Sequence, residues 1–258
     1  MIEARNISKT FSGDRLVLDN VSAKFEKGRN NLIIGQSGSG KTVLMKCLVG
    51  LLEVDQGMVL YDERNFSEML LNERKKIRQE IGMLFQGAAL FDSFTVEENV
   101  MFPLNMFTEK TPEEKTDRVN FCLKRVNILN SNHLYPSEIS GGMKKRVGLA
   151  RAICLRPSII LYDEPTTGVD PITGDAINDL IVELHDKLKV TSIAVTHDMT
   201  SAYKIADSIA MLYKGKIVQV DSPEEIKNTT NPVVKQFITG AATGPITQQE
   251  NLSFGHIA

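Results

Sequence analysis

The sequence predicts an α/β protein whose core is a sheet of parallel strands, and three observations lead to this prediction. A buried strand at residues 31–34 is followed by a glycine-rich loop and then a helix at 42–49. A second buried strand, at 159–162, ends in two acidic residues, and the carboxyl ends of strands are where open α/β sheets place ligands. The length of 258 residues suits one large core with an inserted lobe.

The first part of the chain contains strands that we expect to form an antiparallel sheet beside the core, at residues 2–8, 16–25 and 58–61. From 88 to 155 the pattern turns helical and poor in strands, which predicts an inserted α-helical subdomain. One of its helices should begin after Thr111, because Thr is a good N-cap, Pro112 suits the first turn and Glu114 can complete a capping box.

The remainder of the chain returns to the α/β pattern. Asp170 should begin a helix over residues 172–188. Further strands are predicted at 158–162, 191–196, 208–213 and 216–220. Because no internal repeat is visible, we expect one domain over residues 1–240. The sequence from 241 to 258 has little periodicity and is predicted to be a tail.

The glycine-rich loop is a phosphate-binding loop with every required position filled. It reads Gly35-Gln36-Ser37-Gly38-Ser39-Gly40-Lys41-Thr42. Glycines let the backbone direct its N–H groups at a phosphate, and the following helix adds partial positive charge. Lys41 is expected to reach the β- and γ-phosphates, and the Thr42 hydroxyl to ligate Mg²⁺. A chance turn would not explain the strand before the loop and the helix after it, so the sequence predicts binding of a nucleoside triphosphate.

The acidic pair after the strand at 159–162 predicts hydrolysis. We expect Asp163 to hold Mg²⁺ through water, and Glu164 to orient and polarise the attacking water. A carboxylate can both position that nucleophile and accept its proton. The alternative is an acidic N-cap pair opening a helix, which the following Pro165-Thr166-Thr167-Gly168 disfavours.

A third motif, Ile139-Ser140-Gly141-Gly142-Met143, resembles the signature sequence of ATP-binding-cassette (ABC) ATPases. Ser140 is a good N-cap, and the two glycines allow close backbone approach. In that family the helix N-terminus faces the γ-phosphate held by a second copy. The resemblance therefore implies that Ser140, Gly141 and Gly142 bind ATP across a dimer. Met143 replaces the usual Gln, so any contact made by that amide is absent.

Further residues match the order of motifs in this family. Phe11 stands where an aromatic ring stacks on adenine, Gln86 follows the strand at 81–85, and His197 ends the strand at 191–196. The resemblance implies that Gln86 contacts the metal or the attacking water, that His197 contacts the γ-phosphate, and that residues 167–171 contact the second copy. Taken singly, Phe11 and His197 would be ordinary partly buried side chains, and only their order favours the functional interpretation.

Composition is that of a soluble cytosolic protein. There are 30 Lys and Arg residues against 32 Asp and Glu, which argues against a nucleic-acid partner. The basic runs Lys144–Arg146 and Glu73–Lys76 are predicted to be solvated helix faces. Three cysteines, Cys47, Cys122 and Cys154, should be reduced thiols. No apolar stretch is long enough to span a bilayer, so any action at a membrane requires another chain.

The segment at residues 87–104 resembles one branch of ABC ATPases, the Mla-type subunits that move phospholipid with a permease and an Mce-domain lipid-binding protein. The resemblance implies an ATPase held at the cytoplasmic face of the inner membrane by an integral membrane permease. Apolar side chains here should form a groove for a cytoplasmic helix of that permease, or else belong to the core of the lobe. These side chains are Leu90, Phe91, Phe94, Met101, Phe102 and Phe107.

Other classes of protein predict different features. The ATPase of an importer for a small solute would share every catalytic marker and differ only in its permease. A soluble ABC protein acting on ribosomes or DNA would carry two cassettes or a long coiled-coil insertion. A P-loop kinase would need a site for a phosphoryl acceptor and has no use for residues 140–142.

Overall fold

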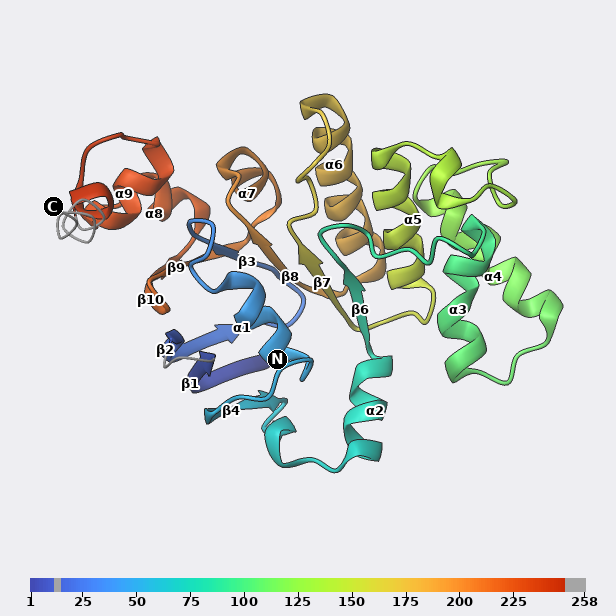
Figure 1. The fold of residues 1–258 in the computed structure, drawn as a ribbon, viewed down its shortest axis with the longest axis horizontal. Coiled ribbons are helices and arrows are strands. Elements are labelled where there is room, and N and C mark those ends of the chain that lie inside the picture. Colours follow the sequence, from blue (N-terminus) through green and yellow to red (C-terminus); the bar gives the residue numbers. More distant parts are fainter. Residues whose placement is uncertain (12–14, 249–258) are drawn as a thin grey trace, which may run out of the picture.

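The computed structural model describes residues 1–11 and 15–248, whose strands form two sheets (Figure 1). The smaller sheet is antiparallel, as expected, with the strand order β2-β1-β4-β5. Its strands are β1 (Ile2–Phe11), β2 (Arg15–Phe25), β4 (Gln56–Tyr61) and β5 (Arg64–Asn65). β1 extends beyond the predicted residue 8 because Lys9, Thr10 and Phe11 still pair with β2.

The larger sheet carries the strands that lead to the phosphate loop and the acidic pair. Its order is β10-β9-β3-β8-β7-β6, and all of its pairings are parallel except that of the edge strand β10. The strands are β3 (Asn30–Ile34), β6 (Ile81–Leu84), β7 (Ile159–Asp163), β8 (Thr191–Thr196), β9 (Ser208–Tyr213) and β10 (Lys216–Asp221). Ile34 pairs with Thr196 and Asp163 with Val195, so β3, β7 and β8 end at the same edge of the sheet.

Alternate residues of β3 point into two separate cores, as the pleat of a strand requires. Ile33 packs with Leu44 of α1 (Lys41–Leu48) and with the antiparallel sheet. Leu32 and Ile34 pack on the other face with α6 (Pro171–Leu188) and α7 (Met199–Ile205). The strand is therefore covered on both faces, which explains its uninterrupted burial.

Residues 88–155 form the expected helical lobe, at the right of Figure 1. It contains α3 (Val96–Phe107), α4 (Pro112–Arg125) and α5 (Gly141–Ile153). The predicted capping box is present at α4: the Thr111 hydroxyl accepts from the Glu114 N–H, and the Thr111 N–H donates to the Glu114 carboxylate. α2 (Leu71–Gln79) precedes β6. No helix in the described part of the chain is both long and apolar enough to cross a bilayer.

The segment after Gly240 begins by packing against the domain instead of leaving it. α8 (Pro223–Lys227) and α9 (Pro232–Thr239) follow β10, at the left of Figure 1. Ile246 is buried, and its N–H donates to Gln236 Oε1 at 2.8 Å. The predicted tail therefore differs from the structure over 241–248, because one apolar side chain and a buried amide hold it to α9. Residues 249–258 lie outside the described residues.

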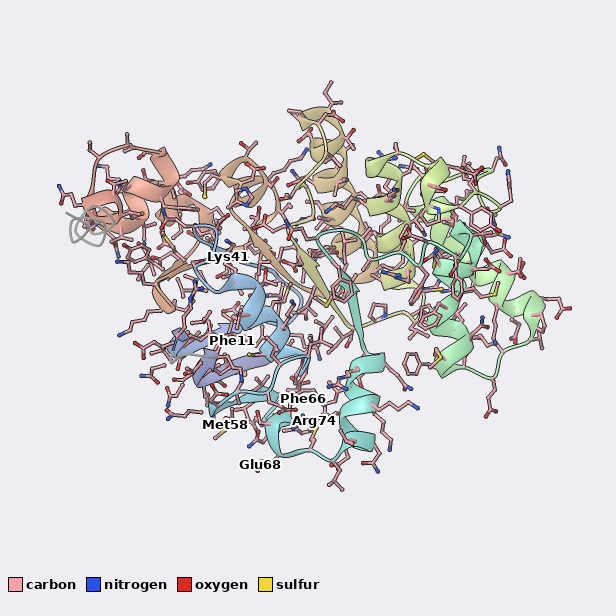
Figure 2. The ribbon with its side chains drawn as sticks, in the orientation of Figure 1. Phe11, Lys41, Met58, Phe66, Glu68 and Arg74 are labelled. Atoms are coloured by element: carbon pink, nitrogen blue, oxygen red, sulfur yellow. The ribbon has the colours of Figure 1, made fainter. Side chains whose placement is uncertain are left out.

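The prediction of solvated basic runs was wrong at two positions. Arg74 is buried: its guanidinium lies 5.3 Å from the Phe66 ring and donates to the Glu53 carboxylate (Figure 2). Lys145 is buried too, and its ammonium donates to the carbonyls of Gln86 and Glu164. Each helix turns one member of its basic run inward, and there acceptors offset the cost of burying the charge.

Candidate functional site

The phosphate loop joins β3 to α1 in a conformation that needs glycine. Gly40 precedes the helix with φ 105°, in the left-handed region. At Gly35 a Cβ would lie 2.2 Å from the Leu212 carbonyl oxygen, so no side chain fits there. The N-terminus of α1 is therefore open to an anion at the carboxyl edge of the larger sheet.

Lys41 lies folded into this loop. Its ammonium donates to the carbonyl oxygens of Gly35 and Gln36 at 2.8 and 3.0 Å, and lies 3.8 Å from Glu164 Oε1. Burial lowers the pKa of Lys41, and the nearby Glu164 and Asp163 carboxylates oppose that shift. The loop thus holds a buried cation on weak acceptors, which phosphate oxygens can replace.

Thr42 and Asp163 meet at the base of the loop. The Thr42 hydroxyl donates to Asp163 Oδ1 at 3.0 Å. Burial raises the pKa of Asp163, while the hydrogen bond from Thr42 lowers it. A hydroxyl and a carboxylate from two elements are thereby brought together, and oxygen ligands of this kind suit Mg²⁺. The residues present therefore fit the ion that the sequence predicts.

Glu164 lies beside Lys41 in a strained backbone conformation, with φ 48°. Its carboxylate contacts the Nδ1 atom of His197 at 2.9 and 3.0 Å, and accepts from the Thr167 hydroxyl at 3.2 Å. Because a carboxylate only accepts, Nδ1 carries the proton of the imidazole. A hydrogen bond from Nδ1 to a phosphate therefore requires the ring to leave Glu164.

Comparison with known proteins agrees with this geometry. A family model described as ABC transporter matches residues 18–167. The chain belongs to the ABC transporter family. As a member of that family it is an ATPase, and the fold and the phosphate loop predicted from sequence agree with this.

Relatives of this ABC ATPase include the intermembrane phospholipid transport system ATP-binding protein MlaF of Escherichia coli K12. The two are 37% identical over 246 residues, which cover 95% of this chain and 91% of MlaF. The probable ribonucleotide transport ATP-binding protein mkl of Mycobacterium leprae is 36% identical, over 96% of this chain and 72% of the relative. A dimeric, post-hydrolysis structure of the cassette MJ0796 with ADP and phosphate has a TM-score of 0.80 at 31% identity, covering 86% of this chain and 99% of that one.

The remaining predicted residues of the ABC ATPase lie at three different places. Gln86 is exposed after β6, and its carbonyl is held by Lys145. Phe11 ends β1 with a partly exposed ring, below Lys41 in Figure 2. Ser140 caps α5, accepting from the Met143 N–H at 3.2 Å. In Figure 1, strands β8, β7 and β6 separate α5 from α1, so a single chain does not bring Ser140 to Lys41.

The N-terminus of α5 is shaped by its glycines. A Cβ on Gly142 would lie 2.5 Å from Thr173 Cγ2 at the start of α6, so this position accepts no side chain without rearrangement. Gly141 has open space on that side, with only the Gly168 carbonyl near, at 3.9 Å. The first turn of α5 is therefore close to the loop at 167–171 and still exposes its backbone.

Sequence reasoning missed two contacts of this site. The Thr167 hydroxyl donates a hydrogen bond to the Glu164 carboxylate, and the Lys145 ammonium donates one to the Glu164 carbonyl at 3.1 Å. For Thr167 a signal existed, since a hydroxyl three residues after a carboxylate in a turn can reach back to it. For Lys145 none did, because a charge run does not reveal which member faces a carbonyl in another segment.

Proposed function

We propose that this ABC ATPase powers phospholipid transport through a separate integral membrane permease, at the cytoplasmic face of the inner membrane. The observation that carries the proposal is the likeness to MlaF along nearly the whole of both chains, since MlaF is named for intermembrane phospholipid transport. An Mce-domain lipid-binding protein completes the proposed complex. Nucleic acid is not part of this proposed complex.

An apolar groove supports the proposal that the chain binds a permease. A cavity of about 450 Å³ lies between β6, α3 and α5, lined mainly by aromatic and aliphatic side chains. Phe91, Phe102 and Phe107 are among the side chains that line it. Leu90 and Met101 pack against the core of the lobe, and the Phe94 ring lies tilted against the Phe91 ring with 5.1 Å between centroids. Three of the six predicted groove residues thus face the cavity, which suits an apolar helix.

In the proposed reaction the loop at 35–42 holds the triphosphate of ATP, with the Phe11 ring against adenine. Lys41 leaves its two carbonyl acceptors for the phosphates. Thr42, and Asp163 through water, would hold Mg²⁺, which would neutralise phosphate charge. Glu164 orients the attacking water and accepts its proton, while His197 contacts the γ-phosphate and Gln86 the metal or the water.

An importer ATPase for a small solute is the second candidate function. The similarity to mkl, which is named for probable ribonucleotide transport, favours it. Both candidates use the same ATP chemistry and differ in the permease. The proposal of lipid transport therefore needs a test that includes the membrane partner.

That test compares permeases in proteoliposomes. The chain should increase its ATPase rate with a Mla-type permease and move fluorescent phospholipid in the presence of ATP. A permease for a small solute serves as control and should give neither effect. Stimulation by the solute permease alone would refute lipid transport and support the importer.

We predict that two chains enclose two ATP molecules head to tail, with Lys41 of one chain and Ser140 of its partner at each site. The separation of α5 from α1 within one chain supports this, as does the dimeric MJ0796 cassette. ATP supplies contacts that exist only in the closed dimer, so a slowly hydrolysing chain should dimerise when ATP binds. Light scattering of Glu164→Gln should show monomer without nucleotide and dimer with Mg-ATP.

A matched control for the dimer carries Ser140→Arg in addition. The arginine side chain would lie at the exposed N-terminus of α5, away from the ATP loop of its own chain. The variant should therefore bind ATP and stay monomeric. Dimerisation that ignores Mg-ATP, or that survives Ser140→Arg, would contradict the head-to-tail arrangement.

A further inference from the structure

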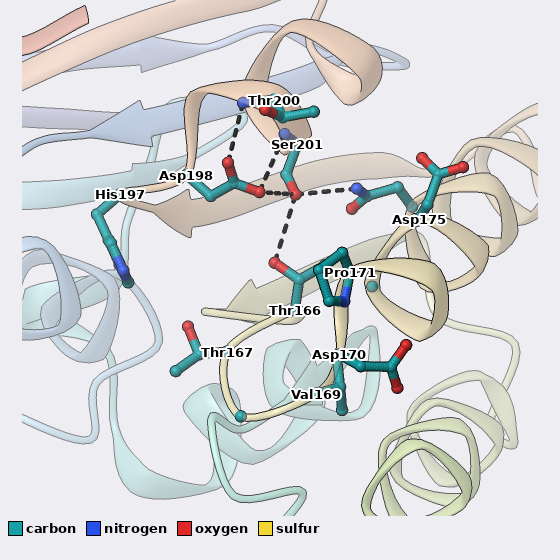
Figure 3. Close-up of a pocket in the computed structure, with 13 residues that line it drawn as sticks. Thr166, Thr167, Val169, Asp170, Pro171, Asp175, His197, Asp198, Thr200 and Ser201 are labelled. Atoms are coloured by element: carbon teal, nitrogen blue, oxygen red, sulfur yellow. Dashed lines mark hydrogen bonds between the residues drawn. The ribbon is translucent and has the colours of Figure 1, made fainter. Parts of the chain in front are cut away.

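A partly buried network of hydrogen bonds joins the loop after Glu164 to the loop after His197, and Ser201 of α7 is its centre (Figure 3). The Ser201 side chain is 1% exposed. Its hydroxyl donates to Asp198 Oδ2 at 2.5 Å, accepts from Asn178 Nδ2 at 2.9 Å and lies 3.3 Å from Thr166 Oγ1.

The direction of each bond follows from the number of protons. A serine hydroxyl has one proton, and a carboxylate only accepts, so the proton of Ser201 belongs to Asp198. The Thr166 hydroxyl must then donate to Ser201. Every bonding position of the Ser201 oxygen is thereby used, by three different segments: the loop after β7, helix α6 and the N-cap of α7.

Two of these segments carry the residues assigned to catalysis. Thr166 follows Glu164 by two residues, and Asp198 follows His197 directly. The positive φ of Glu164 costs energy, and such a conformation persists only where neighbouring contacts hold it. The bond between Thr166 and Ser201 lies two residues from this strained position.

Hydrogen bonds matter here because the loop at 166–171 borders an open hollow on one side. Thr166, Ser201 and Asn178 line a cavity of about 450 Å³ beside the loop at 166–171. Asn178 Oδ1 is buried without a hydrogen-bond partner in the described part of the chain. Close-packed side chains would fix a loop by themselves, whereas a loop beside a cavity depends on its polar contacts.

We propose that Ser201 is a positioning residue for ATP hydrolysis, whose hydroxyl keeps the Glu164 loop and the His197 loop in register when the γ-phosphate enters between them. The inference rests on the roles assigned to Glu164 and His197 above. Without the hydroxyl, Thr166 loses its acceptor, and Glu164 can relax from its strained backbone conformation.

The test is a double-mutant cycle on the full chain, with phosphate release measured against ATP concentration. Ser201→Ala should lower kcat about tenfold, because small misplacement of reacting groups costs rate, and leave KM for ATP within about twofold. Thr166→Val should do the same. The double variant should lose no more than either single one, since both remove the same bond.

Ser192→Ala is the matched control, since Ser192 lies in β8 and is also 1% exposed. It should keep parental kcat. The Ser192 hydroxyl has no hydrogen-bond partner in the described part of the chain, so its loss should shift thermal melting less than the loss of the Ser201 hydroxyl. Independent, multiplying losses in the double variant would overturn the proposal, and so would parental kcat in Ser201→Ala. If Glu164→Gln hydrolyses ATP at the parental rate, the assignment of Glu164 fails instead.

Discussion

Replacing Glu164 with Gln should reduce the rate of ATP hydrolysis by roughly 10²–10⁴-fold, because the amide accepts no proton from the attacking water. ATP binding should persist, since the loop at 35–42 and Lys41 are unchanged. Gln has the shape of Glu and can still accept from the Thr167 hydroxyl, so the strained loop should remain in place. Phosphate release and binding of a fluorescent ATP analogue measure the two effects separately.

Lys41→Ala is the contrasting variant. It removes the cation that the phosphates need, so nucleotide affinity itself should fall, whereas Glu164→Gln should leave affinity almost unchanged. His197→Ala should slow turnover with less effect on affinity. Hydrolysis by Glu164→Gln at the parental rate would show that this carboxylate is not the proton acceptor.

Replacing Phe91 with Asp should abolish co-purification with the permease. A carboxylate in the groove would be buried without a partner beneath the docked helix, at a cost of several kcal/mol, enough to abolish a modest interface. The free chain should tolerate the change, because the Phe91 side chain is 42% exposed. Its backbone is held by Asn99, which accepts from the Phe91 N–H at 2.8 Å, and this bond is independent of the ring contacts with Phe94 and Phe102.

The matched control is Phe121→Asp on α4, because Phe121 is 43% exposed in the same lobe and does not line the groove. The Phe121→Asp chain should still co-purify with the permease. Nucleotide binding and thermal melting of both free chains complete the measurement. An intact complex with Phe91→Asp, or a Phe91→Asp chain that fails to fold, would assign Phe91 to the core of the lobe.

The fold and the centre of the site were predictable because their residues are defined by chemistry at fixed spacing. The loop at 35–42 and the pair Asp163 and Glu164 each follow a run of apolar residues, and parallel strands bring such positions to one edge. Caps at Thr111 and Asp170 fixed the helix starts for the same reason: a side-chain oxygen must meet an orphan N–H.

The roles of the other buried residues could not be predicted, because they depend on contacts between segments that are distant in the sequence. Ser201 belongs to no motif, and its importance arises only where Asn178 and Thr166 approach it. Burial of Lys145 depends on carbonyls that follow β6 and β7. Ile246 is a single apolar residue without periodicity, so nothing in the sequence showed that it would return to α9.

Lys145 joins helix α5 to the segments that follow β6 and β7. It lies on α5, the helix whose first turn would contact the nucleotide of the partner, and its ammonium grips the main chain at both Gln86 and Glu164. Burial lowers the pKa of Lys145, and the carboxylates of Asp163 and Glu164 oppose that shift. A shift of α5 would therefore be transmitted to the main chain at Gln86 and Glu164, which ties the position of this helix to both segments.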